Sequence, residues 1–123
     1  MKIRVSELNR IKGSLAKLLV AAGIPPRVCY RATKFSKVVV SEIESLETAR
    51  IALVRRYGVE TKGGLSVSPV NQDQFEGDFN SILAEEVELP DLRIASGDLE
   101  KSDLTFLDYA NLDFLIFDST EGE

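Results

Sequence analysis

The sequence predicts a mainly helical α+β domain: a long antiparallel helix pair, a short N-terminal helix and a small two-stranded element. Two observations lead to this class. Apolar residues recur with the helical period over residues 26–57 and again over 69–86. Short segments that alternate polar and apolar residues lie before and after these stretches. No repeat or low-complexity linker interrupts the chain, so we expect a single domain over 1–123, with residues 118–123 disordered.

The first elements follow from local signals. Lys2–Val5 alternates polar and apolar residues and predicts a short strand. Ser6 is the expected cap of a short helix that stops at Gly23. The apolar residues of this helix are three or four positions apart: Leu8, Ile11, Leu15, Leu18, Leu19 and Ala22.

The longest predicted element is a helix over Pro26–Tyr57, about 45 Å long at the usual rise per residue. Pro26 suits the first position of a helix, and Gly58 follows the end of the apolar stripe. The stripe is formed by Val28, Ala32, Phe35, Val39, Ile43, Leu46, either Ile51 or Leu53, and Tyr57.

A glycine-containing loop joins this helix to the second one. Gly63 and Gly64 form its tip, around which a small hairpin could form. Ser68-Pro69 then starts a helix that continues to about Glu86. We interpret Gly77 within it as a point where the long helix approaches closely.

Two further alternating segments, Val87–Leu89 and Leu92–Ile94, indicate one strand bent at Pro90. We expect this strand to pair with Ile3–Val5. Ser102-Asp103 should then begin a short helix. The apolar stripe expected on that helix is Leu104, Leu107 and Ala110.

Composition limits the possible functions. There is no His, which removes the commonest general base, and the single Cys29 cannot form an internal disulfide. We expect no enzyme activity, no cofactor, no signal peptide and no membrane span. Asn71–Asp78 resembles a calcium loop, but Phe75 occupies a ligand position and Ile82 stands where Glu is needed. We therefore expect no metal site.

Charge divides the sequence into two halves. Residues 1–62 contain thirteen Lys or Arg and five Asp or Glu, a net charge of +8. Residues 63–123 contain two Lys or Arg and fifteen Asp or Glu, a net charge of −13. Such asymmetry indicates either internal pairing, for instance between the two long helices, or two surfaces with different partners.

The basic half contains a row of cations that should share one helix face: Arg27, Arg31, Lys34 and Lys37. They could contact phosphates or another anion. The chain as a whole is acidic and offers no interleaved aromatic residues for base stacking, so we do not expect nucleic acid to be the main partner.

The acidic half contains the residues that we expect to bind a protein partner. Tyr109–Phe117 mixes apolar and acidic residues, and it is either the last packed element or an arm that docks into a neighbouring subunit. Its carboxylates and those of the 85–88 segment could also imitate a nucleic-acid backbone. The predicted partner-binding residues are Glu85, Glu86, Glu88, Tyr109, Phe114 and Phe117.

The order of these features resembles a family of short, uncharacterised tailed-bacteriophage proteins. The resemblance covers most of the chain up to about residue 115. Its sharpest parts are the helix end Glu47-Thr-Ala-Arg50 with Leu53 and Tyr57-Gly58, and the segment Glu85–Leu89. The family's genes often lie near virion structural genes. The family has no assigned catalytic residues, so the resemblance implies none in this chain.

The resemblance implies a non-enzymatic structural or assembly protein that binds a phage virion component, or copies of itself, in the virion or the host cytoplasm. Two alternatives remain. One is a phage inhibitor of a host nuclease or defence protein that acts through its acidic half. The other is a nucleic-acid-binding accessory factor that acts through the basic row.

Overall fold

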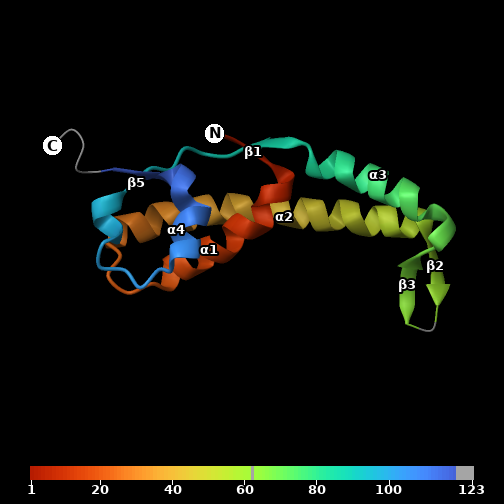
Figure 1. The fold of residues 1–123 in the computed structure, drawn as a ribbon, viewed down its shortest axis with the longest axis horizontal. Coiled ribbons are helices and arrows are strands. Elements are labelled where there is room, and N and C mark those ends of the chain that lie inside the picture. Colours follow the sequence, from red (N-terminus) through yellow and green to blue (C-terminus); the bar gives the residue numbers. More distant parts are fainter. Residues whose placement is uncertain (62, 119–123) are drawn as a thin grey trace.

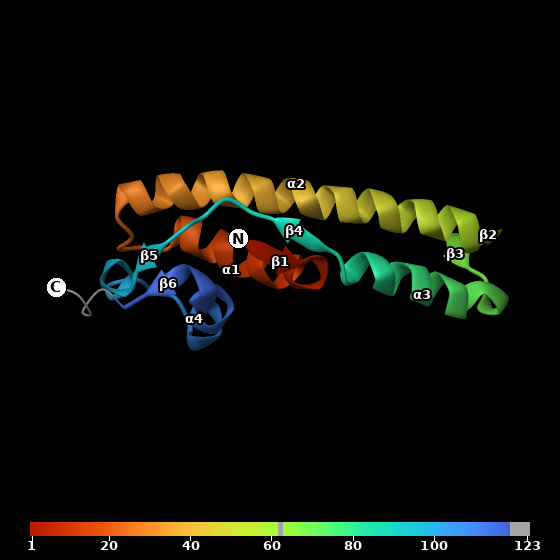
Figure 2. The same cartoon turned by 90° about the horizontal axis from the view of Figure 1, so that it is seen from above.

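Helix α1 (Leu8–Val20) lies at the centre of the fold. Figure 2 shows it between the N-terminal half of α2 (Pro26–Tyr57) and α4 (Phe106–Leu112). This computed structural model describes residues 1–61 and 63–118. The predicted class is confirmed, because helices dominate and the strands form small two-stranded sheets. We predicted disorder for residues 118–123, and of these, residues 119–123 lie outside the described residues.

The hydrophobic core is built on both sides of α1. Leu8, Ile11, Leu15 and Leu18 are completely buried, as the helical period predicted. One side of the core comes from α2, and the other comes from segments after residue 88. The buried residues from these two sources are Val28, Ala32, Phe35, Val39 and Leu46, and Leu89, Leu92, Ile94, Leu99, Leu112 and Leu115. Each of these side chains other than that of Ala32 contributes about 1.5–3 kcal/mol relative to an exposed one.

Helix α2 has the predicted limits, Pro26 and Tyr57. Its second half leaves the core and runs antiparallel to α3 (Gln72–Leu83), as Figures 1 and 2 show. We call residues 47–83, apart from the undescribed residue 62, the distal arm. Every residue of α3 is described and none of its side chains is fully buried. The helix pair is therefore present, but the main core forms on α1.

The distal arm is held by a few specific contacts. The Tyr57 hydroxyl donates a hydrogen bond to the Asp78 carboxylate, which joins the end of α2 to α3. The hydrogen bond raises the pKa of Tyr57. The Asn71 amide donates to the Tyr57 carbonyl at 3.2 Å, and the rings of Phe75 and Phe79 stack with centroids 5.9 Å apart.

The loop after α2 does form a hairpin, made of β2 (Gly58–Thr61) and β3 (Gly64–Val67). The predicted helix start at Ser68-Pro69 is a 3₁₀ turn, Pro69–Asn71, which the Ser68 side chain does not cap, and α3 starts at Gln72. The helix ends at Leu83 and not near Glu86 as predicted, because the chain pairs as a strand from Glu86 onward.

Strand β1 (Lys2–Arg4) pairs antiparallel with β4 (Glu86–Glu88), as predicted, with Ile3 opposite Val87. The prediction of one strand bent at Pro90 is wrong. A separate strand, β5 (Ile94–Ala95), pairs in parallel with β6 (Ile116–Phe117) at the other end of the core. Pro90 lies between β4 and β5. Because proline has no backbone N–H, it cannot donate a hydrogen bond to a neighbouring strand.

Two predicted helix starts are also displaced. Ser6 lies within a 3₁₀ turn, Val5–Glu7, and its side chain caps neither this turn nor α1. Helix α4 starts at Phe106 and not near Ser102, because Thr105 and Asp108 form a capping box. The predicted stripe is therefore wrong at Leu107 and Ala110, which are exposed, whereas Leu104 is partly buried against the core.

Replacing glycine by alanine should have opposite effects on stability at Gly77 and at Gly23. Nothing lies within 4 Å of a Cβ built on Gly77, so the predicted close approach of α2 is wrong there. We expect Gly77→Ala to stabilise the protein by about 0.5–1 kcal/mol, since alanine is the better helix former.

Gly23 has φ +81°, and a Cβ there would lie 2.5 Å from the Lys101 carbonyl oxygen. Gly23→Ala should therefore destabilise by more than about 1 kcal/mol. Urea unfolding of both variants measures the difference, and equal midpoints would contradict this account of the two positions.

Candidate functional site

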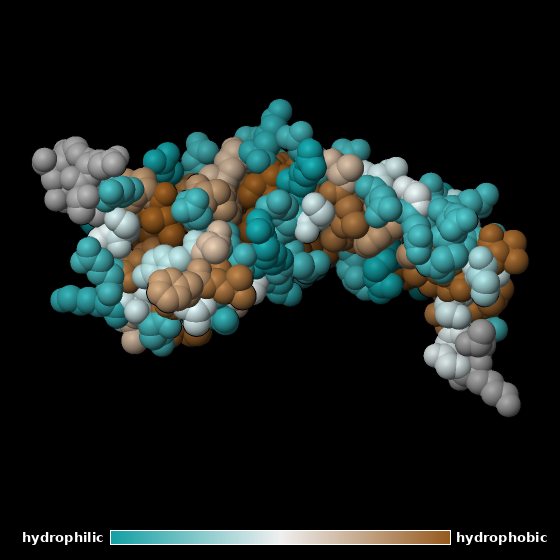
Figure 3. Space-filling view, in the orientation of Figure 1, coloured by the Kyte–Doolittle hydropathy of each residue, from teal (hydrophilic) through white to brown (hydrophobic). Residues whose placement is uncertain are grey.

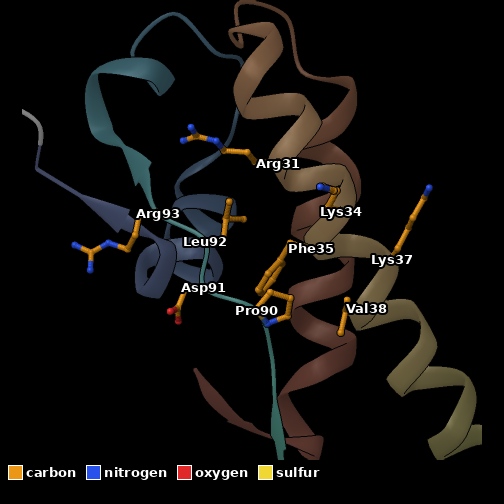
Figure 4. A pocket seen from close by; sticks show the side chains of 9 residues that line it. All are labelled: Arg31, Lys34, Phe35, Lys37, Val38, Pro90, Asp91, Leu92 and Arg93. Atoms are coloured by element: carbon orange, nitrogen blue, oxygen red, sulfur yellow. The ribbon is translucent and has the colours of Figure 1, made fainter.

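A groove with a cavity volume of about 690 Å³ lies between α2 and the extended segment 90–93. Figure 4 shows the side chains that line it. Its floor is apolar and includes Phe35, Val38, Pro90 and Leu92. Phe35 and Leu92 are only 2% and 4% exposed, so the floor is part of the core. Because the hydrophobic core fixes the floor, the groove belongs to the folded state itself.

The rim of the groove is basic. Arg31, Lys34 and Lys37 line the α2 side, and Arg93 lies on the opposite side. Figure 4 shows that the charged ends of Lys37 and Arg93 point outward, away from the floor. Asp91 is the one carboxylate among the lining residues, all of which are described. Two of the cations also contact aromatic rings: the Lys34 ammonium lies 5.1 Å from the centroid of Tyr30, and the Arg93 guanidinium 5.3 Å from that of Phe117.

Three of the four predicted basic residues therefore meet at one groove. The fourth, Arg27, is exposed one turn earlier on α2 and does not line it. The predicted complementarity between the two long helices is not seen: none of the ion pairs within residues 1–61 and 63–118 joins α2 to α3. Helix α3 lies along the other half of α2, away from the basic row (Figure 2).

The carboxylates predicted to bind a partner lie near the β1–β4 ladder. Glu86 and Glu88 are opposite Arg4 and Lys2, so each faces a cation across the sheet. The Glu88 carboxylate also accepts from the N-terminal ammonium of Met1 at 2.8 Å, and this hydrogen bond raises the pKa of the ammonium. Cations therefore lie beside two of the three predicted carboxylates of this segment, Glu86 and Glu88.

Glu85, at the start of this segment, has an exposed side chain, and its backbone carbonyl accepts from the Val5 N–H at 2.9 Å. The C-terminal segment packs on the core of its own chain. The Tyr109 hydroxyl donates to the Leu99 carbonyl at 2.8 Å, and Leu115 is fully buried. Phe114 and Phe117 remain exposed, although the Phe117 backbone is held in β6.

A second exposed surface was not predicted. Phe106 is 96% exposed and Leu107 is 66% exposed at the start of α4, and Val20 at the end of α1 is 83% exposed. Val20 and Thr105 line the same shallow cavity, which places Val20 near this helix start. We call Val20, Phe106 and Leu107 the α4 patch. Figure 3 shows apolar surface gathered over this end of the molecule.

The α4 patch could have been found from the sequence. Thr105-x-x-Asp108 is a capping-box pattern, which places the first helical residue at Phe106. With that start, the buried face of the helix includes Asp108 and Leu112, and Phe106 and Leu107 point outward.

Asp108 is a buried carboxylate that joins α4 to α1. It accepts from the Thr105 backbone N–H at 3.1 Å and from the Ser14 hydroxyl at 3.3 Å, and the Lys17 ammonium lies 3.3 Å away. Asn111 donates to Ser14 at 3.0 Å. Burial alone would raise the pKa of Asp108, but the Thr105 and Lys17 interactions together outweigh it and lower the pKa. All of these partners are internal, so we assign Asp108 a structural role.

Other kinds of site were also sought. Within the described residues, no group of three or more His, Cys, Asp or Glu is placed to hold a metal ion. Among the described helices none is long and apolar enough to span a membrane. Cys29 is a free thiol, partly buried on α2. Comparison with protein-family models, curated proteins and solved structures gives no match.

The lowered pKa of Asp108 predicts a pH-dependent contribution to stability. Because the folded state favours the charged form, this contribution is present above the unfolded pKa, about 4, and is lost as the pH falls through the lower folded value. Asp108→Asn should therefore lower the thermal midpoint at neutral pH, and the difference from wild type should shrink in acid. A difference that is constant with pH would contradict this role. The exposed Asp103→Asn is the control.

Proposed function

We propose that this protein is a non-enzymatic structural or assembly protein that binds another protein subunit. The observation that carries this proposal is the α4 patch, in which two adjacent large apolar side chains are exposed on a helix anchored to the core. The family resemblance supports a more specific proposal: the partner is a head or tail component of a tailed phage, or a second copy of this chain.

The composition of the α4 patch is typical of a protein interface. Aromatic side chains such as Phe are enriched in the buried core of protein interfaces, where a few residues contribute most of the binding free energy. Polar groups surround the patch, including the partly exposed Lys17 and the exposed Asp103, as in the rim of a typical interface. The capping box and the buried Asp108 hold the helix in place, so little ordering is needed on binding.

The nuclease-inhibitor alternative depends on a surface of unpaired carboxylates. Here Glu86 and Glu88 lie opposite Arg4 and Lys2, and this arrangement weakens the imitation of a nucleic-acid backbone. We therefore place the structural role first.

The proposal predicts a partner held mainly by apolar contact. The tagged protein is captured, at low and at high salt, from cells of its native host during infection, and the bound proteins are quantified by mass spectrometry. We expect capsid, portal or tail proteins, or the untagged chain, at a fixed ratio and with little effect of salt. Phe106→Ser with Leu107→Ser should reduce capture by about tenfold or more.

The control for this experiment is Val70→Ser, which changes an equally exposed apolar side chain on the distal arm. It should leave capture unchanged, and thermal unfolding checks that all variants fold. Recovery of a single host nuclease or defence protein that is released by salt would instead favour the inhibitor. Unchanged capture by the double variant would exclude the α4 patch as the interface.

A further inference from the structure

We infer that the groove between α2 and residues 90–93 binds an acidic protein segment that carries apolar side chains. This goes beyond the proposed function, because the groove and the α4 patch share no residue. Each surface can be altered without changing the other.

The shape and floor of the groove fit an apolar anchor. Its volume, about 690 Å³, lies within the range of known ligand pockets. Phe35 and Leu92 are almost completely buried, so the accessible part of the floor comes mainly from the exposed Pro90 and the half-buried Val38. An apolar side chain inserted against them would lose contact with water. Figure 4 shows Phe35, Pro90 and Leu92 together between the two walls. A ligand that is only charged would leave this floor unused.

The spacing of the cations selects a ligand with several separated negative charges. Arg31, Lys34 and Lys37 are three residues apart, so they rise along the helix by about 4.5 Å per step. Arg93 adds a cation on the opposite wall. An acidic peptide can place several carboxylates along this row, whereas an amphiphile with one head group would engage only one end of it.

A protein segment fits better than nucleic acid. Single-stranded nucleic acid gains affinity by stacking its bases on exposed aromatic faces. Phe35, the aromatic side chain that lines the groove, is only 2% exposed. The exposed rings of Tyr30 and Phe117 lie beside the groove, and each has a rim cation over one face, Lys34 and Arg93 respectively. Apolar side chains flanked by Asp or Glu match both the floor and the rim.

The test uses a fluorescently labelled synthetic peptide in which Leu and Phe alternate with Asp and Glu, titrated with the purified full chain. Fluorescence anisotropy should show saturable binding that weakens as salt is added. Lys34→Glu combined with Lys37→Glu should weaken binding by about tenfold or more. The matched control is Lys12→Glu combined with Arg55→Glu, the same change of charge at two exposed positions outside the groove. It should bind nearly as wild type does.

Two altered peptides test the two halves of the inference. Replacing Asp and Glu by Asn and Gln tests the rim, and replacing Leu and Phe by Ser tests the floor. Both should bind more weakly than the original peptide. If either binds equally well, or if the control variant loses as much affinity as the groove variant, the inference is wrong. Tighter binding of a single-stranded oligonucleotide, lost in the Lys34 and Lys37 variant, would overturn it in favour of nucleic acid.

The peptide test is independent of the capture experiment on the α4 patch. The Phe106 and Leu107 variant should bind the acidic peptide as wild type does. Absence of peptide binding by the folded wild-type chain would refute the groove inference and leave the α4 patch proposal standing.

Discussion

The fold depends on the burial of α1 between α2 and the C-terminal elements. Leu8, Ile11, Leu15 and Leu18 are all completely buried, and the N-terminal half of α2 and the C-terminal elements pack around them. Both candidate surfaces result from this packing. The floor of the basic groove is the outer side of the core between α2 and Leu92, and the α4 patch is exposed because the buried network of Asp108 fixes α4 against α1. The packing of apolar side chains thus fixes the elements that carry both candidate surfaces.

The charge asymmetry of the sequence does not become two oppositely charged faces of the structure. The basic groove takes Arg93 and Asp91 from the acidic half of the chain, and the acidic strand β4 is paired with the basic strand β1. Several ion pairs are local, such as Glu47 with Arg50, and exposed pairs of this kind contribute only about 0–1 kcal/mol. The other ion pairs join distant segments: the N-terminal ammonium of Met1 pairs with Glu88 and Asp91, and Lys17 pairs with the buried Asp108.

Local signals predicted much of the fold, and pairing between distant segments accounts for most of the errors. Pro26 and Gly58 marked the ends of α2 correctly because proline and glycine act on the backbone directly. The end of α3 was predicted too late because Glu86 pairs with Arg4 of β1. Pairing with such a distant segment leaves no signal in the local sequence. The basic row was visible as a helical spacing, but the groove needs Leu92 and Arg93 from a distant segment. The α4 patch was missed because the Thr105 capping box was overlooked.

Helix α2 passes from the core into the distal arm without a break, yet its two halves are supported differently. Up to Leu46 its buried side chains belong to the main core. In the arm, as far as the structure describes it, Leu53 is the one buried side chain, and Phe79, Ile82 and Leu83 of α3 are partly buried against the core. We therefore expect the amides in the buried part of the first half to exchange their hydrogens mainly through global unfolding. Those near Tyr57 should exchange through local separation of the end of the arm. One continuous helix thus belongs to two cooperative units, and its middle is the boundary between local and global unfolding.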